Sequence, residues 1–162
     1  MSGRTHSLMG RVDDGRHFLP LRVYYEDTDS GGMVYYANYL KFAERARTEM
    51  LRLAGFDHGA ISDRFGVAFV VRDCTVSYKS PARLDDLLEV RSCFPEVGGA
   101  SLTAEQVICR ETTELARLDV RLACMTGGGR PSRIPELLRE ALTAYRSATD
   151  TGSDNEQTEK WD

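Results

Sequence analysis

The stretch that decides the fold is residues 19–55, LPLRVYYEDTDSGGMVYYANYLKFAERARTEMLRLAG. Apolar and polar side chains alternate over residues 19–26, which predicts a half-buried strand. The polar and glycine run at residues 27–32 cannot continue a strand and predicts a loop. Apolar side chains then recur three or four residues apart, which predicts a long amphipathic helix from Asn38, its expected N-cap, to Gly55, its expected stop.

Beyond this helix the apolar pattern changes from the period of a helix to that of strands. Four more strands are expected, at residues 67–79, 87–94, 101–110 and 115–125, followed by a short helix at 135–146. One strand, a long helix and four strands joined mostly by short connections predict an α+β fold, in which an antiparallel sheet wraps around a single helix. Such a sheet leaves an edge uncovered, so we expect at least a dimer.

The composition excludes several classes of protein. The 162 residues are 41% hydrophobic and 28% charged, with a net charge of −4, which suits one domain with its own core. There is no basic excess of the kind that a dedicated nucleic-acid binder needs. No segment is apolar enough for a signal peptide or a membrane span. We therefore expect a soluble, cytoplasmic protein that does not span a membrane.

The two ends of the chain differ from its middle. Residues 147–162 carry five acidic side chains and one basic, with few apolar groups, and predict a disordered acidic tail. Residues 1–17 are expected to form a flexible N-terminal tail, which leaves one domain at residues 18–146.

The cysteines and histidines do not form a recognisable site in the sequence. The four cysteines are far apart and predict buried free thiols: Cys74, Cys93, Cys109 and Cys124. No pair of them, with a nearby histidine, has the spacing of a zinc site. No metal is expected.

The loop before the long helix is where chemistry is most easily built. A helix N-terminus presents unpaired backbone N–H groups that can stabilise an oxyanion, and a carboxylate beside it, such as Asp29, can act as base or nucleophile. Aspartate and glycine are also ordinary turn and capping residues. Composition alone leaves both interpretations open, and Asp27 is better read as a loop residue than as a second catalytic acid.

Longer matches are more specific than this loop. The run from Arg22 to Tyr39, its continuation through Phe42 and residues 44–52, and the segments 67–72 and 78–86 closely resemble hotdog-fold acyl-CoA thioesterases. The likeness is strongest to the YbgC-like, Tol-Pal-associated branch of the wider 4-hydroxybenzoyl-CoA thioesterase family. It covers roughly residues 18–145.

The resemblance implies a hotdog fold, homodimers or homotetramers, and an active site at the subunit interface. It implies that Asp29 attacks the thioester carbonyl or activates the attacking water, and these two roles stay open. It further implies that backbone N–H groups near Tyr35 and Tyr36 polarise the carbonyl. YbgC-like proteins usually have histidine where this chain has Tyr36, so acid-base help from that position is not expected here.

The remaining candidate residues fall into two groups. Those expected to form the oxyanion site or substrate pocket are Gly32, Val34, Tyr35, Tyr36, Tyr39 and Glu44. Glu44 is equally compatible with a surface ion pair. Those expected to bind the phosphates of coenzyme A are Arg72, Lys79, Arg83, Arg130 and Arg133, each of which would otherwise be an ordinary solvated cation. No cofactor is expected.

The leading hypothesis is therefore an acyl-CoA thioesterase that takes acyl-CoA, with acyl carrier protein as another possible carrier. The alternative is a non-catalytic module on the same fold that binds acyl groups or acyl carrier protein. A hotdog dehydratase or hydratase ranks last, because that chemistry generally relies on a histidine base and none lies in the strand-to-helix loop.

Overall fold

A computed structural model of the chain describes residues 8–146. Its elements in chain order are β1 (Arg11–Asp13), β2 (Arg16–Arg22), the 3-10 turn η1 (Tyr25–Asp27), α1 (Asn38–Leu53), α2 (His58–Phe65), β3 (Val67–Tyr78), β4 (Leu87–Val97), β5 (Ser101–Arg110), β6 (Thr113–Thr126) and α3 (Glu136–Thr143). None of the described helices is long and apolar enough to cross a membrane.

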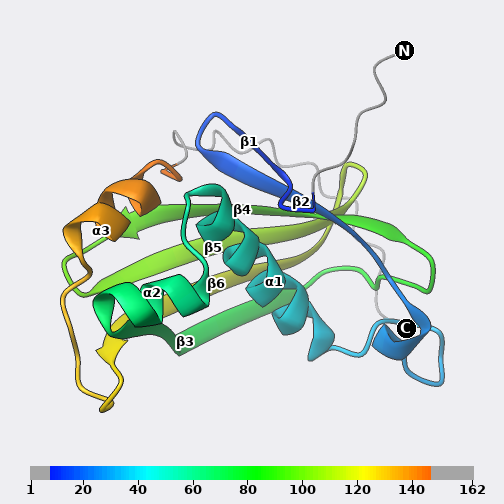
Figure 1. The fold of residues 1–162 in the computed structure, drawn as a ribbon. Helices are drawn as coiled ribbons and strands as arrows, with labels where there is room; N and C mark the ends of the chain where they lie inside the picture. The colour runs from blue at the N-terminus through cyan, green and yellow to red at the C-terminus, as the bar shows by residue number, and fades with distance from the viewer. Residues whose placement is uncertain (1–7, 147–162) are drawn as a thin grey trace.

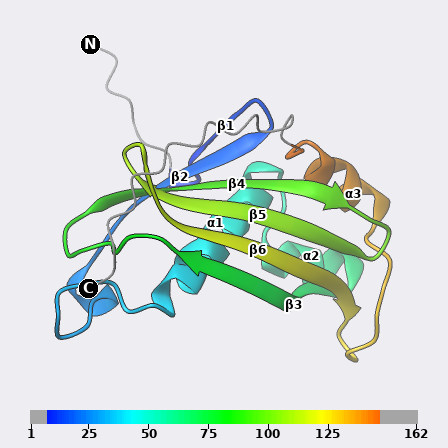
Figure 2. The same cartoon turned by 180° about the vertical axis from the view of Figure 1, so that it is seen from behind.

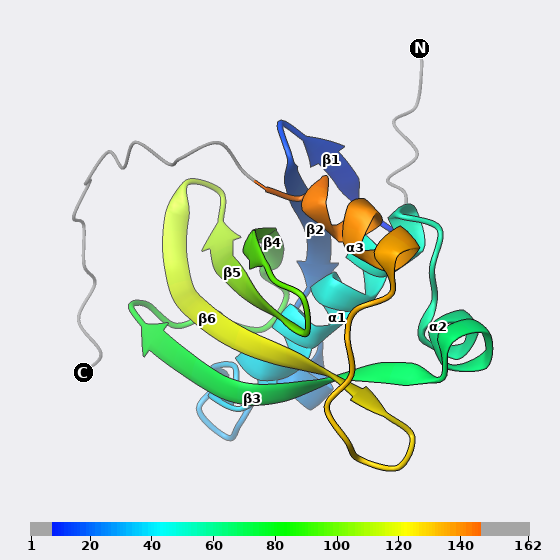
Figure 3. The ribbon, with the colours of Figure 1, turned by 90° about the vertical axis from the view of Figure 1, so that its left-hand side faces the viewer.

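The six strands form one sheet in the order β1-β2-β4-β5-β6-β3, and every neighbouring pair is antiparallel. All three α-helices lie on one face of the sheet (Figure 1). Seen from behind, the other face carries none of the described helices (Figure 2). Viewed from the end, the sheet curls around α1 (Figure 3). The predicted α+β architecture is confirmed.

The helix α1 packs on the concave face because one stripe of its surface is apolar. Tyr39, Phe42 and Met50 from this stripe are among the largest fully buried side chains, and Ala43 and Ala46 between them are also fully buried. Small side chains at the centre of the stripe permit close approach of the helix to the sheet.

The strand β6 likewise has one buried face and one exposed face. Leu118 and Val120 are buried in the core, whereas Asp119 and Arg121 are exposed on the other face. This alternation of buried and exposed residues is typical of a strand with one covered face.

The N-terminal part of the chain differs from the prediction. Residues 11–17, expected to belong to a flexible tail, form β1 and the start of β2, and His17 is fully buried. The first long strand therefore ends at Arg22 rather than at residue 26. The chain leaves the sheet there and enters η1, where the backbone N–H of Tyr24 donates to Oδ2 of Asp27 at 2.8 Å.

Several predicted boundaries also shift. The helix α1 ends at Leu53 rather than at Gly55. Asn38 is its first residue rather than its N-cap, because the Asn38 side chain donates to the carbonyl of Asp27 instead (2.8 Å). The strands β4 and β6 are longer than expected and α3 is shorter. The predicted acidic tail lies outside the described residues.

The cysteine prediction is right for three of the four thiols. All four are free, and Cys93, Cys109 and Cys124 are buried. Cys74 is exposed because it lies on β3, which forms one edge of the sheet and has mostly exposed residues.

Candidate active site

The loop around Asp29 is closed by its own backbone. The N–H of Asp29 donates to the carbonyl of Met33 at 2.9 Å, and the N–H of Gly32 donates back to the carbonyl of Asp29 at 3.1 Å. Oδ1 of Asp29 accepts a further hydrogen bond from the N–H of Gly31 at 2.9 Å. The carboxylate is thus held in a fixed direction while it remains exposed to solvent.

Gly32 has a conformational role in this loop. Its φ of +75° lies in the left-handed region, which a side chain disfavours. Its carbonyl accepts from the N–H of Leu84 at 3.2 Å, so the loop is anchored to the segment that follows β3. Gly32 therefore shapes the predicted site.

The backbone N–H groups at the start of α1 are not equally available. The N–H of Tyr35 already donates to the carbonyl of Asp27 at 3.0 Å, so it is not free to polarise a substrate carbonyl in this structure. Within residues 8–146, the N–H of Tyr36 has no acceptor. Tyr36 thus supplies the one free N–H of the expected pair.

The aromatic side chains near this N–H form a cluster. The rings of Tyr35 and Tyr36 lie 4.7 Å apart, and the ring of Tyr78 meets that of Tyr36 edge-on at 6.4 Å. The hydroxyl of Tyr78 donates to the carbonyl of Tyr36 at 2.9 Å. The end of β3 therefore holds the segment that leads into α1.

Val34 and Tyr39, both predicted pocket residues, are buried supports of the loop. Val34 donates its N–H to the carbonyl of Ala82 at 2.9 Å. The hydroxyl of Tyr39 accepts from the N–H of Ala82 at 2.9 Å, and burial raises the pKa of this phenol. Both side chains belong to the core.

Glu44 lies apart from the Asp29 loop. It lines a cavity of 170 Å³ between the helices and the sheet, next to Arg47, Thr48 and His58. These polar side chains stand around the cavity, while Nε2 of His58 lies 3.1 Å from the hydroxyl of Thr48. The structure therefore separates Glu44 from the residues with which it was grouped.

The five predicted phosphate-binding cations do not form one cluster within the chain. Arg83 is nearest to the loop, since its backbone bridges to Met33. Lys79 is ion-paired with Glu114. Arg72 is exposed on β3. Arg130 and Arg133 follow the far end of β6, and Lys79 lies beside its beginning.

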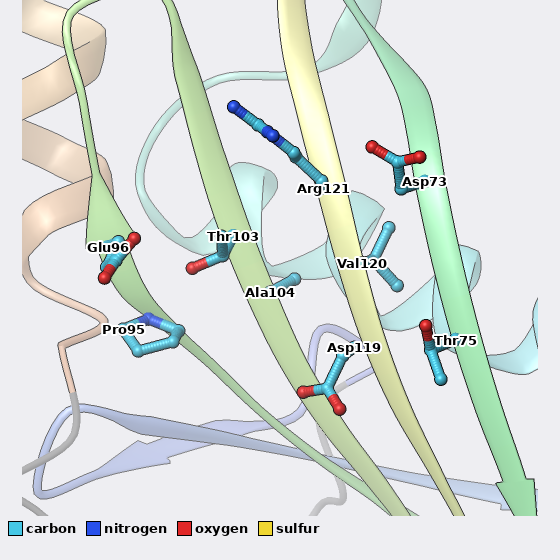
Figure 4. A pocket seen from close by; sticks show the side chains of 9 residues that line it. All are labelled: Asp73, Thr75, Pro95, Glu96, Thr103, Ala104, Asp119, Val120 and Arg121. Atoms are coloured by element: carbon cyan, nitrogen blue, oxygen red, sulfur yellow. The ribbon is translucent and has the colours of Figure 1, made fainter.

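A second depression on the described surface is a different feature. It measures 390 Å³ and lies on the face of the sheet turned away from α1 (Figure 4). Asp73, Glu96, Asp119 and Arg121 give it a polar lining, and it includes none of the predicted site residues. Its position separates it from the Asp29 loop.

Sequence reasoning missed several residues that shape these sites. Tyr78 lies one residue before the end of a predicted strand, and no local pattern indicates that its hydroxyl reaches Tyr36. Arg47, on the predicted long helix, is not among the predicted site residues. Its guanidinium is partly buried and donates to Oε1 of Gln106 at 2.8 Å, and the loss of hydration lowers its pKa. The one signal in the sequence was that positions 43, 50 and 51, three or four residues from Arg47 along the helix, are apolar.

Comparisons with known proteins identify the family. Residues 23–142 match the family model of the thioesterase-like superfamily. The chain is 44% identical over 132 residues to the acyl-CoA thioesterase YbgC of Haemophilus influenzae, covering 81% of this chain and 96% of that protein. It is 49% identical over 108 residues to the acyl-CoA thioester hydrolase YbgC of Escherichia coli O6:H1, covering 65% and 79%.

Solved structures give the same fold. A probable thioesterase from Bartonella henselae superposes with a TM-score of 0.71 at 35% identity, covering 74% of this chain and 99% of that one.

Proposed function

The chain belongs to the thioesterase-like superfamily, as a YbgC-like member with the hotdog fold, and on that premise we propose that it hydrolyses acyl-CoA thioesters with Asp29 as the reacting carboxylate. The observation that carries the proposal is the carboxylate of Asp29, fixed by Gly31 and exposed beside the start of α1. A free backbone N–H at Tyr36 stands at the same helix start.

Two chemical routes fit this arrangement. In the first, the Asp29 carboxylate attacks the thioester carbonyl, the C–S bond breaks, and water then hydrolyses the mixed anhydride. In the second, Asp29 takes a proton from a water molecule as that water attacks the carbonyl. In both, the departing sulfur leaves as the coenzyme A thiolate or thiol, and the N–H of Tyr36 stabilises the oxyanion.

The proposed enzyme is a homodimer paired through β3. This strand is twelve residues long, and among the described residues, 8–146, it has β6 as its one partner in the sheet and no strand along its other side. Val70 and Val71 on it are 41% and 51% exposed. A long, apolar, uncovered edge is a template for pairing with another strand, and a second copy of β3 is complementary to it.

Release of free thiol from acyl-CoAs of graded chain length tests the activity directly. The purified full chain should release thiol far faster than the spontaneous reaction. Comparing the same acyl groups on coenzyme A and on acyl carrier protein shows which carrier the enzyme accepts. Binding of these thioesters without thiol release would instead identify a non-catalytic acyl-binding module.

A further inference from the structure

The 170 Å³ cavity lies under α1 and α2 and extends across the concave face of the sheet. Its lining comes from three helices and four strands: Glu44, Arg47, Thr48 and Leu51 of α1, His58 of α2, Phe69 and Val71 of β3, Phe94 of β4, Leu102 of β5, Leu122 of β6 and Leu142 of α3. None of these lining residues belongs to the loop around Asp29.

The polarity of the cavity changes from one end to the other. Glu44, His58 and Val71 are exposed and mark the mouth, at the uncovered edge of β3. Leu51, Phe94, Leu102, Leu122 and Leu142 are buried and form the floor. The cavity is therefore polar where it opens and apolar where it ends.

The far end of the cavity is a wall made by α3. This helix packs on β4, which is three strands from β3 in the sheet. The N–H of Phe94 donates to the carbonyl of Tyr145 at 2.9 Å, and the hydroxyl of Tyr145 donates to the carbonyl of Met50 at 2.6 Å. These bonds connect the end of α3 to both β4 and α1, and they hold Leu142 in position at the end of the cavity.

The mouth of the cavity is distant from the Asp29 loop of the same chain. The Tyr36 segment that follows that loop is bonded to Tyr78 at the end of β3, whereas the mouth includes Val71, so Tyr78 and Val71 are separated by ~23 Å of strand at ~3.3 Å per residue. Antiparallel pairing of two β3 strands brings the end of one beside the start of the other. Asp29 of one copy then faces the cavity mouth of the second.

We propose that this cavity receives the acyl group of the substrate as an unbranched aliphatic chain, and that Leu142 sets the length it accepts. The inference rests on the proposed function. The 170 Å³ of the cavity is well below the ~300–1,000 Å³ of common small-molecule pockets, so it suits an acyl chain of modest length. We therefore expect the best substrates to be medium-chain acyl-CoAs, such as hexanoyl- and octanoyl-CoA, rather than long-chain ones.

The floor also selects against polar acyl groups. Its five side chains, Leu51, Phe94, Leu102, Leu122 and Leu142, carry no hydrogen-bonding group. The hydroxyl of a hydroxybenzoyl group would be buried there without a side-chain partner, which costs free energy. A straight aliphatic chain carries no such group.

A chain-length profile of kcat/KM for the full chain and a set of α3 variants tests the proposal. Leu142→Ala deepens the cavity and should raise the ratio of dodecanoyl- to hexanoyl-CoA hydrolysis by about tenfold or more. Leu142→Val keeps most of the packing and should shift the ratio less, in the same direction. This variant allows the test to be made if Leu142→Ala does not fold. Leu137→Ala is the matched control, because Leu137 is on the same helix but 51% exposed, and its profile should equal that of the parent.

Two results would overturn the assignment. One is an unchanged chain-length ratio in folded Leu142→Ala and Leu142→Val, and the other is a preference of the parent for 4-hydroxybenzoyl-CoA over hexanoyl-CoA. If no thioester is hydrolysed at all, the proposed function fails separately. Calorimetric binding of non-hydrolysable hexanoyl- and dodecanoyl-CoA thioethers to the parent and to Leu142→Ala then tests the cavity assignment. Tighter binding of the dodecanoyl thioether by the variant than by the parent supports the assignment, and identical binding by both proteins refutes it.

Discussion

The phenolic hydroxyl of Tyr78 donates a 2.9 Å hydrogen bond to the backbone carbonyl of Tyr36. The bond joins the last residue of the edge strand β3 to the turn that leads into α1. It therefore couples the edge proposed for dimerisation to the segment that bears the free N–H.

Loss of this bond should impair turnover more than binding. Tyr78→Phe removes one hydrogen bond that positions the Tyr36 segment, and we expect kcat to fall about five- to tenfold with KM nearly unchanged. Tyr36→Phe leaves both backbone groups of residue 36 in place and should cost little. Steady-state kinetics on a medium-chain acyl-CoA measures both variants, and a large loss in Tyr36→Phe would instead assign a role to its hydroxyl.

Asp29→Asn removes the reacting charge but keeps an oxygen that accepts from Gly31. We expect kcat to fall by ~10²-fold or more, the usual scale for losing a general base or nucleophile, with little change in melting temperature. Glu26→Gln neutralises an exposed carboxylate three residues earlier and is the control, with activity near that of the parent. A folded Asp29→Asn variant with normal turnover would show that another group does the chemistry.

The position of the carboxylate should matter as well as its charge. A Cβ at Gly31 would lie 3.3 Å from Oδ1 of Asp29, close enough to displace it by a few tenths of an ångström. Gly31→Ala is expected to lower kcat about three- to tenfold, because small misplacements of a reacting group are costly. Gly127→Ala, where an added Cβ meets no atom within 4 Å, should leave kcat unchanged. Equal kinetics in the two variants would contradict the idea that Asp29 must be held in place.

Dimerisation through β3 predicts that the two edges of the sheet respond differently to charge. Val71→Asp places a carboxylate on the exposed edge of β3 and should convert a species of twice the chain mass into one near 18.1 kDa, with loss of activity. Val12→Asp changes a valine on the opposite edge strand that is 47% exposed, and should leave both properties intact. Sedimentation velocity distinguishes the species. An active monomer of the parent chain would refute the shared site.

Buried His17 predicts a loss of stability in mild acid. Burial lowers its pKa below 6.5, against the opposing effects of the Met9 carbonyl, 2.7 Å from Nε2, and of the Glu49 charge. The unfolded chain then takes up the proton first as the pH falls. The contribution of His17 to the free energy of unfolding is full above about pH 6.5 and declines below it, towards the folded pKa.

Urea unfolding between pH 7.5 and 5 measures this effect. His17→Gln has no imidazole to titrate and should lose less stability across that range than the parent does. His58→Gln, which changes an exposed histidine, should keep the parent's slope. The same slope in His17→Gln and in the parent would show that other groups cause the acid sensitivity.

Local patterns in the sequence determined the parts of this protein that depend on neighbouring residues. The apolar period of α1, the alternation in β6 and the glycine-bearing loop at residues 27–32 each specify their own conformation, because each is fixed by side chains a few positions apart. The order of these elements was enough to predict an α+β fold with one central helix. The position of Asp29 in a loop before a helix followed directly.

Tertiary structure alone decided what these elements bring together. Glu44, on the predicted helix, lies at the cavity rather than with Asp29, and Leu142 meets Phe94 and Leu102 there although they are distant in sequence. His17 is buried because β2 pairs with β4, and Tyr35 loses its free N–H to the carbonyl of Asp27. Such contacts depend on how the sheet curls and on which backbone groups are already paired, and no short-range pattern encodes either.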